Sequence, residues 1–166
     1  MTRSFRISES ALQALEEDAA SKKVSLNTLV NQLLLTHANF GRVYDRLGVI
    51  RISVASFNRL LNACPDEALI ENAKLSGKDT PKAIILAKHG VLSLTTVLDF
   101  VRGWAEYGHL TVYSDVETQG KRVITLMHNH GQKGSTYLRY YFESVFELIG
   151  RQPKITATEH SIAIEI

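Results

Sequence analysis

The sequence predicts an α+β fold in which a short unit of one strand and two helices precedes a larger domain with a helical layer on a mostly antiparallel sheet. Three patterns carry this prediction. Polar and apolar residues alternate at the N-terminus, apolar residues recur at helical spacing up to residue 108, and alternation with a period of two follows. We expect the first unit to comprise residues 1–40 and the second to comprise residues 41–166.

The first predicted element is a strand at the start of the chain, TRSFRIS. Because successive side chains of a strand point to opposite faces, Phe5 and Ile7 share one face, whereas Thr2, Ser4 and Arg6 lie nearer the other. We expect the apolar pair to face a core.

Two amphipathic helices follow, and each is preceded by a serine suited to capping its first turn. Ser8 is expected to cap a helix that Lys22 and Lys23 close, and Ser25 is expected to cap the next one. The apolar positions recur at spacings of three and four: Leu12, Leu15, Ala19 and Ala20, then Leu29, Val30, Leu33 and Leu34. About forty residues bury too little apolar surface to fold alone, so we expect pairing with a second copy.

The segments SFRISESALQAL and VSLNTLVNQLLL resemble the ribbon-helix-helix family of DNA-binding proteins. The resemblance implies that strands of two chains pair antiparallel in an intertwined homodimer and enter the major groove of double-stranded DNA. It therefore implies a sequence-specific transcriptional regulator, which we expect to be a repressor.

The resemblance also assigns roles to individual residues. Thr2, Ser4 and Arg6 match positions that read base edges. The backbone amides of Ser25, Leu26 and Asn27 match a phosphate site at the start of the second helix, where free N–H groups and the positive helix end favour anions.

Arg6 is expected to supply most of the sequence specificity, because its guanidinium can donate two hydrogen bonds to guanine O6 and N7. The alternative is a solvated edge-strand charge that discourages aggregation. Lys22 and Lys23 are further candidates for phosphate contacts, and a solvated helix end is their alternative.

The charge of this segment limits how it can bind DNA. Its charged residues are Arg3, Arg6, Lys22 and Lys23 against Glu9, Glu16, Glu17 and Asp18. The segment is thus formally neutral, and the whole chain carries a net charge of only +2. Strong nonspecific affinity needs many neutralised phosphates, so recognition must come from local geometry and dimerisation.

The composition is that of an ordinary globular protein, with 166 residues, 45% hydrophobic and 22% charged. No apolar run approaches about eighteen residues and no leader pattern is present, so we expect a cytoplasmic protein without a membrane partner. The single Cys64 excludes an intrachain disulfide framework and a multi-cysteine zinc site.

The second unit is predicted to begin with helices over residues 53–108. Pro65 is expected to start a helix that Gly77 ends, and Pro81 to start another that ends at His89-Gly90. Ser93 is expected to cap a third. After residue 108, the segments HLTVYSDVE and KRVITLMHNH predict a hairpin, STYLRYYFESVFELIG a helix, and KITAT and SIAIEI strands that tie the C-terminus into the sheet.

His128-Asn129-His130 is the sequence pattern that most suggests a chemical role. Two residues apart on a strand, both imidazoles point to one side and could ligate a transition metal. A His-x-His strand also occurs in the nickel-responsive regulators, another family with a ribbon-helix-helix unit. However, no cysteine follows His130 closely, and two ligands are fewer than a stable site needs. We therefore expect exposed strand-end histidines, no metal and no cofactor, with a metal-responsive regulator as the lesser alternative.

No catalytic motif is apparent. The sequence lacks GxxxxGK[ST] and GxSxG, and no carboxylate pair has a spacing that compels acid–base catalysis, so we do not expect an enzyme. The loop HGQKGST, with Lys133, is expected to be a simple connection, although its amides could bind an anion. The second domain is expected to sense an effector or to extend a dimer to a tetramer. The alternative function is a protein-interaction or antitoxin-like module in which residues 1–40 only dimerise.

Overall fold

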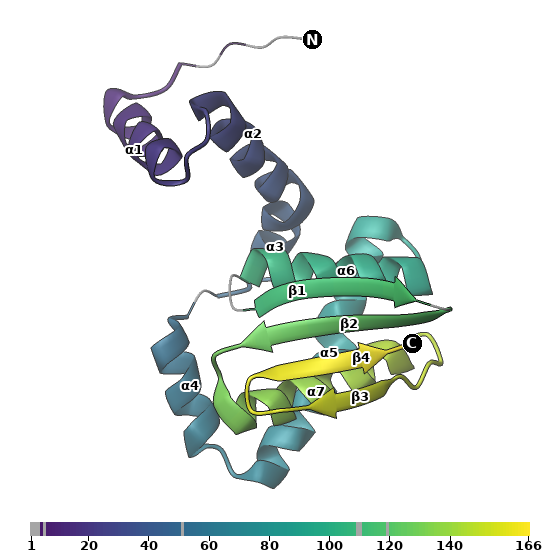
Figure 1. Ribbon diagram of the computed structural model, residues 1–166. Coiled ribbons are helices and arrows are strands. Elements are labelled where there is room, and N and C mark those ends of the chain that lie inside the picture. The colour runs from purple at the N-terminus through teal and green to yellow at the C-terminus, as the bar shows by residue number, and fades with distance from the viewer. Residues whose placement is uncertain (1–3, 5, 51, 109–110, 119) are drawn as a thin grey trace. The chain divides into compact units, whose positions relative to one another are not determined.

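The computed structural model describes residues 4, 6–50, 52–108, 111–118 and 120–166 (Figure 1). The chain divides into two compact units, Met1–Arg46 (unit 1) and Leu47–Ile166 (unit 2). Together the described helices and the four-stranded sheet make an α+β fold, as the sequence predicts.

All the regular secondary structure described in unit 1 is helical. It contains α1 (Glu9–Ser21) and α2 (Leu26–Thr36), and α2 runs through one π-helical turn (His37–Gly41) into α3 (Arg42–Arg46). Both predicted caps are confirmed: Ser8 Oγ accepts a hydrogen bond from the Ala11 N–H at 3.4 Å, and Ser25 Oγ accepts one from the Thr28 N–H at 3.1 Å.

The predicted N-terminal strand is not found among the described residues. Ser4, Arg6, Ile7 and Ser8 have no regular structure, and Ile7 is 44% exposed rather than facing a core. A strand needs a neighbour to receive its ladder hydrogen bonds, and no described strand of this single chain pairs with the segment. Thr2, Arg3 and Phe5 lie outside the described residues.

Unit 2 begins with α4 (Val54–Ala63), α5 (Asp66–His89) and α6 (Leu94–Gly108). The predicted break between Gly77 and Pro81 is wrong, because α5 continues through both residues and buries both. A Cβ added at Gly77 would lie 2.3 Å from the carbonyl oxygen of Tyr141 in the later helix α7 (Gly131–Glu147). Glycine is therefore needed for close helix packing, and this tertiary contact overrides the breaking tendency of Gly and Pro.

The sheet comprises β1 (Thr111–Thr118), β2 (Lys121–His128), β3 (Lys154–Ala157) and β4 (Ser161–Glu165), in the order β1-β2-β4-β3. All neighbouring strands are antiparallel, which confirms the predicted hairpin and sheet. Because β4 lies between β2 and β3, the C-terminal strand is held inside the sheet, as expected.

The core of unit 2 lies between one face of the sheet and the helices α5, α6 and α7, which Figure 1 shows behind the strands. The strands contribute fully buried Ile124, Leu126, Ile162 and Ile164, and α7 contributes Phe142, Val145 and Phe146. Among the described residues, no single helix combines the length and apolarity needed to span a membrane, although the bent pair Asp66–His89 and Leu94–Glu106 passes on length and composition.

Candidate nucleic-acid interface

The two described residues of the predicted base-reading set lie on an exposed arm that precedes α1. Both Ser4 and Arg6 are exposed, and the Ser8 cap that follows them starts α1 without a loop between. Their side chains are therefore available to a partner, whereas Thr2 lies outside the described residues. The structure does not arrange them on one strand face, because that arrangement requires a second strand.

The predicted phosphate site is the start of α2. Ser25 Oγ is engaged by the Thr28 N–H and lies 2.7 Å from Thr28 Oγ1, so the cap satisfies one of the amides of the first turn. Leu26 and Asn27 occupy the first two helical positions, whose N–H groups have no acceptor within the helix. Together with the positive end of the helix dipole, these amides have the chemistry that binds an anion.

Two lysines form the turn that joins α1 to α2. Lys22 is the C-cap of α1, and Lys23 has a φ of 54°, in the left-handed region that favours glycine. The Lys23 N–H donates to the Ala20 carbonyl and the Val24 N–H to the Ala19 carbonyl, which closes the helix. Both lysine side chains are exposed and precede the α2 cap by only a few residues, so they add positive charge near the candidate phosphate site.

Unit 1 has a very small core. In α1 and α2 only Ala19 and Leu29 are buried, at 4% and 1% exposed. In contrast, Leu33, Leu34 and Leu35 of α2 remain 46%, 55% and 51% exposed. The C-terminal half of α2 therefore carries an exposed apolar surface.

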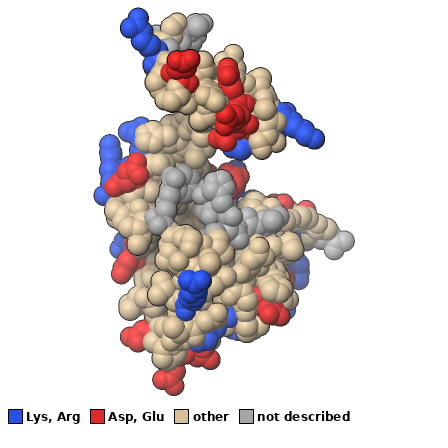
Figure 2. Space-filling view, turned by 90° about the vertical axis from the view of Figure 1, so that its left-hand side faces the viewer, with Lys and Arg blue, Asp and Glu red and all other residues tan. Residues whose placement is uncertain are grey.

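The charge distribution matches the formal neutrality of the segment. On the face shown in Figure 2, Lys and Arg side chains are scattered among Asp and Glu side chains and do not form one basic patch. Bulk attraction for phosphates is therefore weak, and the specific groups named above must position any nucleic acid.

The histidine pair at the end of β2 is a second place where functional groups gather. His128 and His130 are buried, at 3% and 7% exposed, and their rings stack with centroids 5.6 Å apart. The expected exposed position is therefore wrong. Gly131, at a φ of 64°, turns the chain directly into α7, and a Cβ at Gly134 would lie only 2.1 Å from the Cβ of His130.

Hydrogen bonds define the protonation of His128. Its Nδ1 accepts from the backbone N–H of His130 at 3.2 Å, so the proton sits on Nε2, which donates to Ser135 Oγ at 2.9 Å. Burial, with smaller contributions from His130 and His160, lowers the pKa of His128 to about 4. To activate Ser135 as a nucleophile, Nε2 would have to accept a hydrogen bond from the hydroxyl instead of donating one. This pair therefore does not have the arrangement of an activated serine.

His130 is held by a residue distant in sequence. The Asn58 amide donates from Nδ2 to the Asn129 carbonyl at 2.9 Å, which turns Oδ1 toward His130 Nδ1, 2.5 Å away. Burial lowers the pKa of His130 as well. Sequence inspection did not single out Asn58 or Ser135, because neither lies within a spacing that links it to the histidines.

This arrangement does not fit a shared metal site. Both ring nitrogens of His128 are engaged, so chelation by the two imidazoles would break existing hydrogen bonds. Among the described residues, no group of three or more His, Cys, Asp or Glu side chains is placed to hold a metal ion. Lys133 likewise has structural partners: its ammonium donates to the carbonyls of Asn62 and Cys64 at the end of α4.

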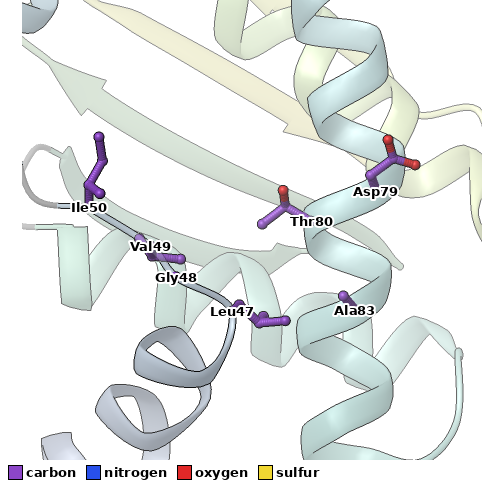
Figure 3. A pocket seen from close by; sticks show the side chains of 7 residues that line it. All are labelled: Leu47, Gly48, Val49, Ile50, Asp79, Thr80 and Ala83. Carbon is purple, nitrogen blue, oxygen red and sulfur yellow. The ribbon is translucent and has the colours of Figure 1, made fainter.

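A pocket of about 560 Å³ lies in unit 2 where the segment after α3 passes α5 (Figure 3). Its lining residues are Leu47, Gly48, Val49 and Ile50 of that segment and Asp79, Thr80 and Ala83 of α5. The lining is open to solvent and mostly apolar, with a single carboxylate. It lacks the several convergent polar groups that would define one ligand.

Comparison of the chain with models of protein families, with curated proteins and with solved structures finds no match. Function must therefore be argued from the chain itself. Unit 1 holds the exposed hydrogen-bond donors and the lysines described above.

Proposed function

We propose that this chain is a homodimeric, sequence-specific DNA-binding transcriptional regulator that acts as a repressor. The observation that carries the proposal is the exposed arm with Ser4 and Arg6, attached directly to a capped helix pair whose second helix exposes Leu33 and Leu34.

A second copy would complete two features of unit 1, the arm that lacks a hydrogen-bonding neighbour and the exposed leucines of α2. Pairing two arms antiparallel gives each one the hydrogen-bonding neighbour that a single chain lacks, and places Ser4 and Arg6 of both copies on one face. Pairing the helices covers Leu33 and Leu34, which enlarges a core that holds little more than Ala19 and Leu29 in α1 and α2. A two-fold dimer is the simplest assembly that does both.

DNA is the partner whose chemistry the exposed polar groups fit. Arg6 supplies bidentate donors for guanine, and the Leu26 and Asn27 amides supply donors for a phosphate at a fixed position. Lys22 and Lys23 add charge beside that position. Because few phosphates are neutralised, specific binding should show a shallow dependence on salt concentration.

The proposal is tested by selecting fragments from random duplex DNA with the full chain at a fixed salt concentration. We expect enrichment of a site with two-fold symmetry. Arg6→Ala should weaken binding to that site by roughly 5- to 150-fold, since a bidentate base contact is worth about 1–3 kcal/mol.

Arg59→Ala is the matched control, because it removes the same charge from an exposed position in α4 of unit 2. It should leave the affinity for the selected site nearly unchanged. Equal losses for the two variants, or no enriched site, would contradict sequence-specific recognition by the arm.

The neutrality of the first forty residues favours one other function, a protein-interaction or antitoxin-like module in which unit 1 only dimerises. In that case the chain should sediment as a dimer, no DNA sequence should be enriched, and a chain lacking residues 1–40 should still bind the protein partner.

A further inference from the structure

The helix α4 contributes little to the core of unit 2. Figure 1 shows it beside the sheet, near the end of β2, whereas α5, α6 and α7 lie behind the strands. Leu61 is the only buried residue of α4, and Val54 and Leu60 are 40% and 61% exposed. Apolar burial therefore accounts for only a small part of the attachment of this helix.

One polar attachment joins the middle of α4 to the residues that follow β2. The Asn58 side chain bonds both the Asn129 carbonyl and His130 Nδ1, at 2.9 and 2.5 Å. Because Asn58 Oδ1 can only accept, His130 carries a proton on Nδ1. The ring of Phe57 meets the His130 ring at 89°, with centroids 5.2 Å apart. His130 is thus the residue on which α4 rests.

A second attachment joins the C-terminal end of α4 to α7. The Lys133 ammonium donates to the carbonyls of Asn62 and Cys64, which belong to the end of the helix and have no donor within it. The Lys133 side chain is 29% exposed, so water can replace it at these carbonyls at little cost. This attachment alone therefore holds α4 weakly.

His130 in turn covers His128. The two rings stack at an angle of 16° with centroids 5.6 Å apart, and the residues are only 7% and 3% exposed. Behind them, His128 is bonded to Ser135 of α7. When α4 leaves, His130 loses its cover first, and His128 can then reach water.

The elements packed against this histidine pair offer no negative charge to balance a proton. The contacts from α4 are uncharged, and α7 brings Ser135 and the cation Lys133, whose ammonium lies 3.4 Å from Asp66. The turn between β3 and β4 brings His160, which lies 3.9 Å from exposed Glu159. Among the described residues, no ion pair joins a carboxylate to His128 or His130.

A proton on the pair is therefore costly while α4 is attached. His128 Nδ1 accepts from the His130 N–H at 3.2 Å, so a proton there would set two donors face to face. Turning the ring away would displace the stacked His130, which carries α4. In accordance with this geometry, burial, with smaller contributions from His130 and His160, lowers the pKa of His128 to about 4, and burial also lowers the pKa of His130. Since a released pair regains water, acid favours the released state.

We propose that α4 is a pH-sensitive latch, which a proton on the stacked histidine pair releases while the sheet and the helices α5, α6 and α7 stay folded. The core survives release because Ile124, Phe142 and Phe146 are fully buried between the strands and α7. The latch acts on the first helix after unit 1. It requires neither DNA nor a second copy, so it is independent of the proposed function.

Native-state amide exchange of the full chain tests the latch at pH 7.5 and pH 5, after correction for the intrinsic exchange rate. With a His128 pKa of about 4 when α4 is attached and about 6.5 when it is released, the opening equilibrium of α4 should rise about 30-fold at the lower pH. This opening should not change in up to about 1 M urea, because releasing one short helix exposes little surface. The α7 amides should exchange through urea-dependent unfolding.

His128→Gln should remove most of the rise, since glutamine does not titrate. His89→Gln is the matched control, because His89 bonds Asp99 of α6 at 2.9 Å and has no printed contact with α4; it should keep the 30-fold rise. Asn58→Ala guards against a His128 variant that alters the fold. It should raise the opening of α4 about fivefold or more already at pH 7.5, through the loss of its hydrogen bonds.

Three results would overturn the latch. The first is exchange of α4 and α7 only together, in one urea-dependent event, since α4 would then not open separately. The second is an undiminished rise in His128→Gln, because another group would then drive release. The third is unchanged opening in Asn58→Ala. Each would leave the DNA-binding proposal untouched, because selection of a DNA site does not depend on α4.

Discussion

Acidification should destabilise unit 2 through His128. Burial and the neighbouring histidines lower the pKa of this side chain in the folded chain to about 4, compared with about 6.5 in the unfolded chain. Between these values the unfolded chain binds a proton that the folded chain does not. The contribution of neutral His128 is therefore complete above about pH 6.5 and is lost as the pH falls toward 4.

The size of the effect follows from the two pKa values. From pH 7.5 to pH 5, the linkage relation gives a loss of about 2 kcal/mol in the free energy of unfolding from His128 alone. The pKa of His130 is also lowered by burial, so its contribution has the same sign. Burial is the largest cause of the lowered pKa of His128, because it disfavours the charged imidazolium; a proton on Nδ1 would in addition face the His130 N–H, from which Nδ1 accepts in the neutral state.

Urea unfolding at the two pH values provides the measurement. Trp104, the only tryptophan, lies in α6 with its ring centroid 5.4 Å from that of Phe142, so its fluorescence reports on the core of unit 2. Replacing His128 with Gln should remove about 2 kcal/mol of the pH-dependent loss, since glutamine does not titrate.

His37→Gln is the control, because the same substitution in unit 1 should leave the pH dependence of the Trp104 transition unchanged. If His128→Gln and the wild type lose stability equally between pH 7.5 and pH 5, the hydrogen-bond assignment of the neutral pair is wrong.

Two further substitutions test the packing of α5 and the turn of unit 1. Gly77→Ala should lower the stability of unit 2 by roughly 1–3 kcal/mol, because the added Cβ would lie 2.3 Å from the Tyr141 carbonyl oxygen. This loss should outweigh the higher helix propensity of alanine. The control, Glu71→Ala at an exposed position of the same helix, should change stability to urea by less than about 0.5 kcal/mol. Lys23→Gly should raise the free energy of unfolding of unit 1 by about 1 kcal/mol, because glycine relieves the left-handed φ, yet it should weaken binding to the selected DNA site. Unchanged stability would refute the strain at residue 23, and unchanged affinity would show that the charge of Lys23 does not contribute to DNA binding.

Local chemistry could be predicted well from the sequence. Ser8, Ser25 and Ser93 each cap a helix as expected from their side chains, because a cap depends on residues three positions apart. The period of two likewise identified the sheet, since Ile162 and Ile164 are fully buried on one face of β4.

The predictions that were wrong depended on contacts between distant residues. The continuous α5 depends on Tyr141 of α7, and the burial of His128 and His130 depends on Asn58 and Ser135. In the candidate interface, Ser4, Arg6, Ile7 and Ser8 have no regular structure, because no described strand of this chain pairs with them. The structure nevertheless leaves Ser4 and Arg6 exposed, which is the condition that the proposed function requires.

The sequence by itself determined the serine caps of α1, α2 and α6 and the alternation that buries Ile162 and Ile164 on one face of β4. These properties follow from side-chain capping, periodicity and hydrogen-bonding capacity within a few residues. Only the tertiary structure decided that Gly77 permits close helix packing, that the two histidines are buried and hydrogen-bonded, and that one face of the sheet lacks helices. Those outcomes depend on which elements meet in space, and no spacing along the chain encodes the distance between Asn58 and His130.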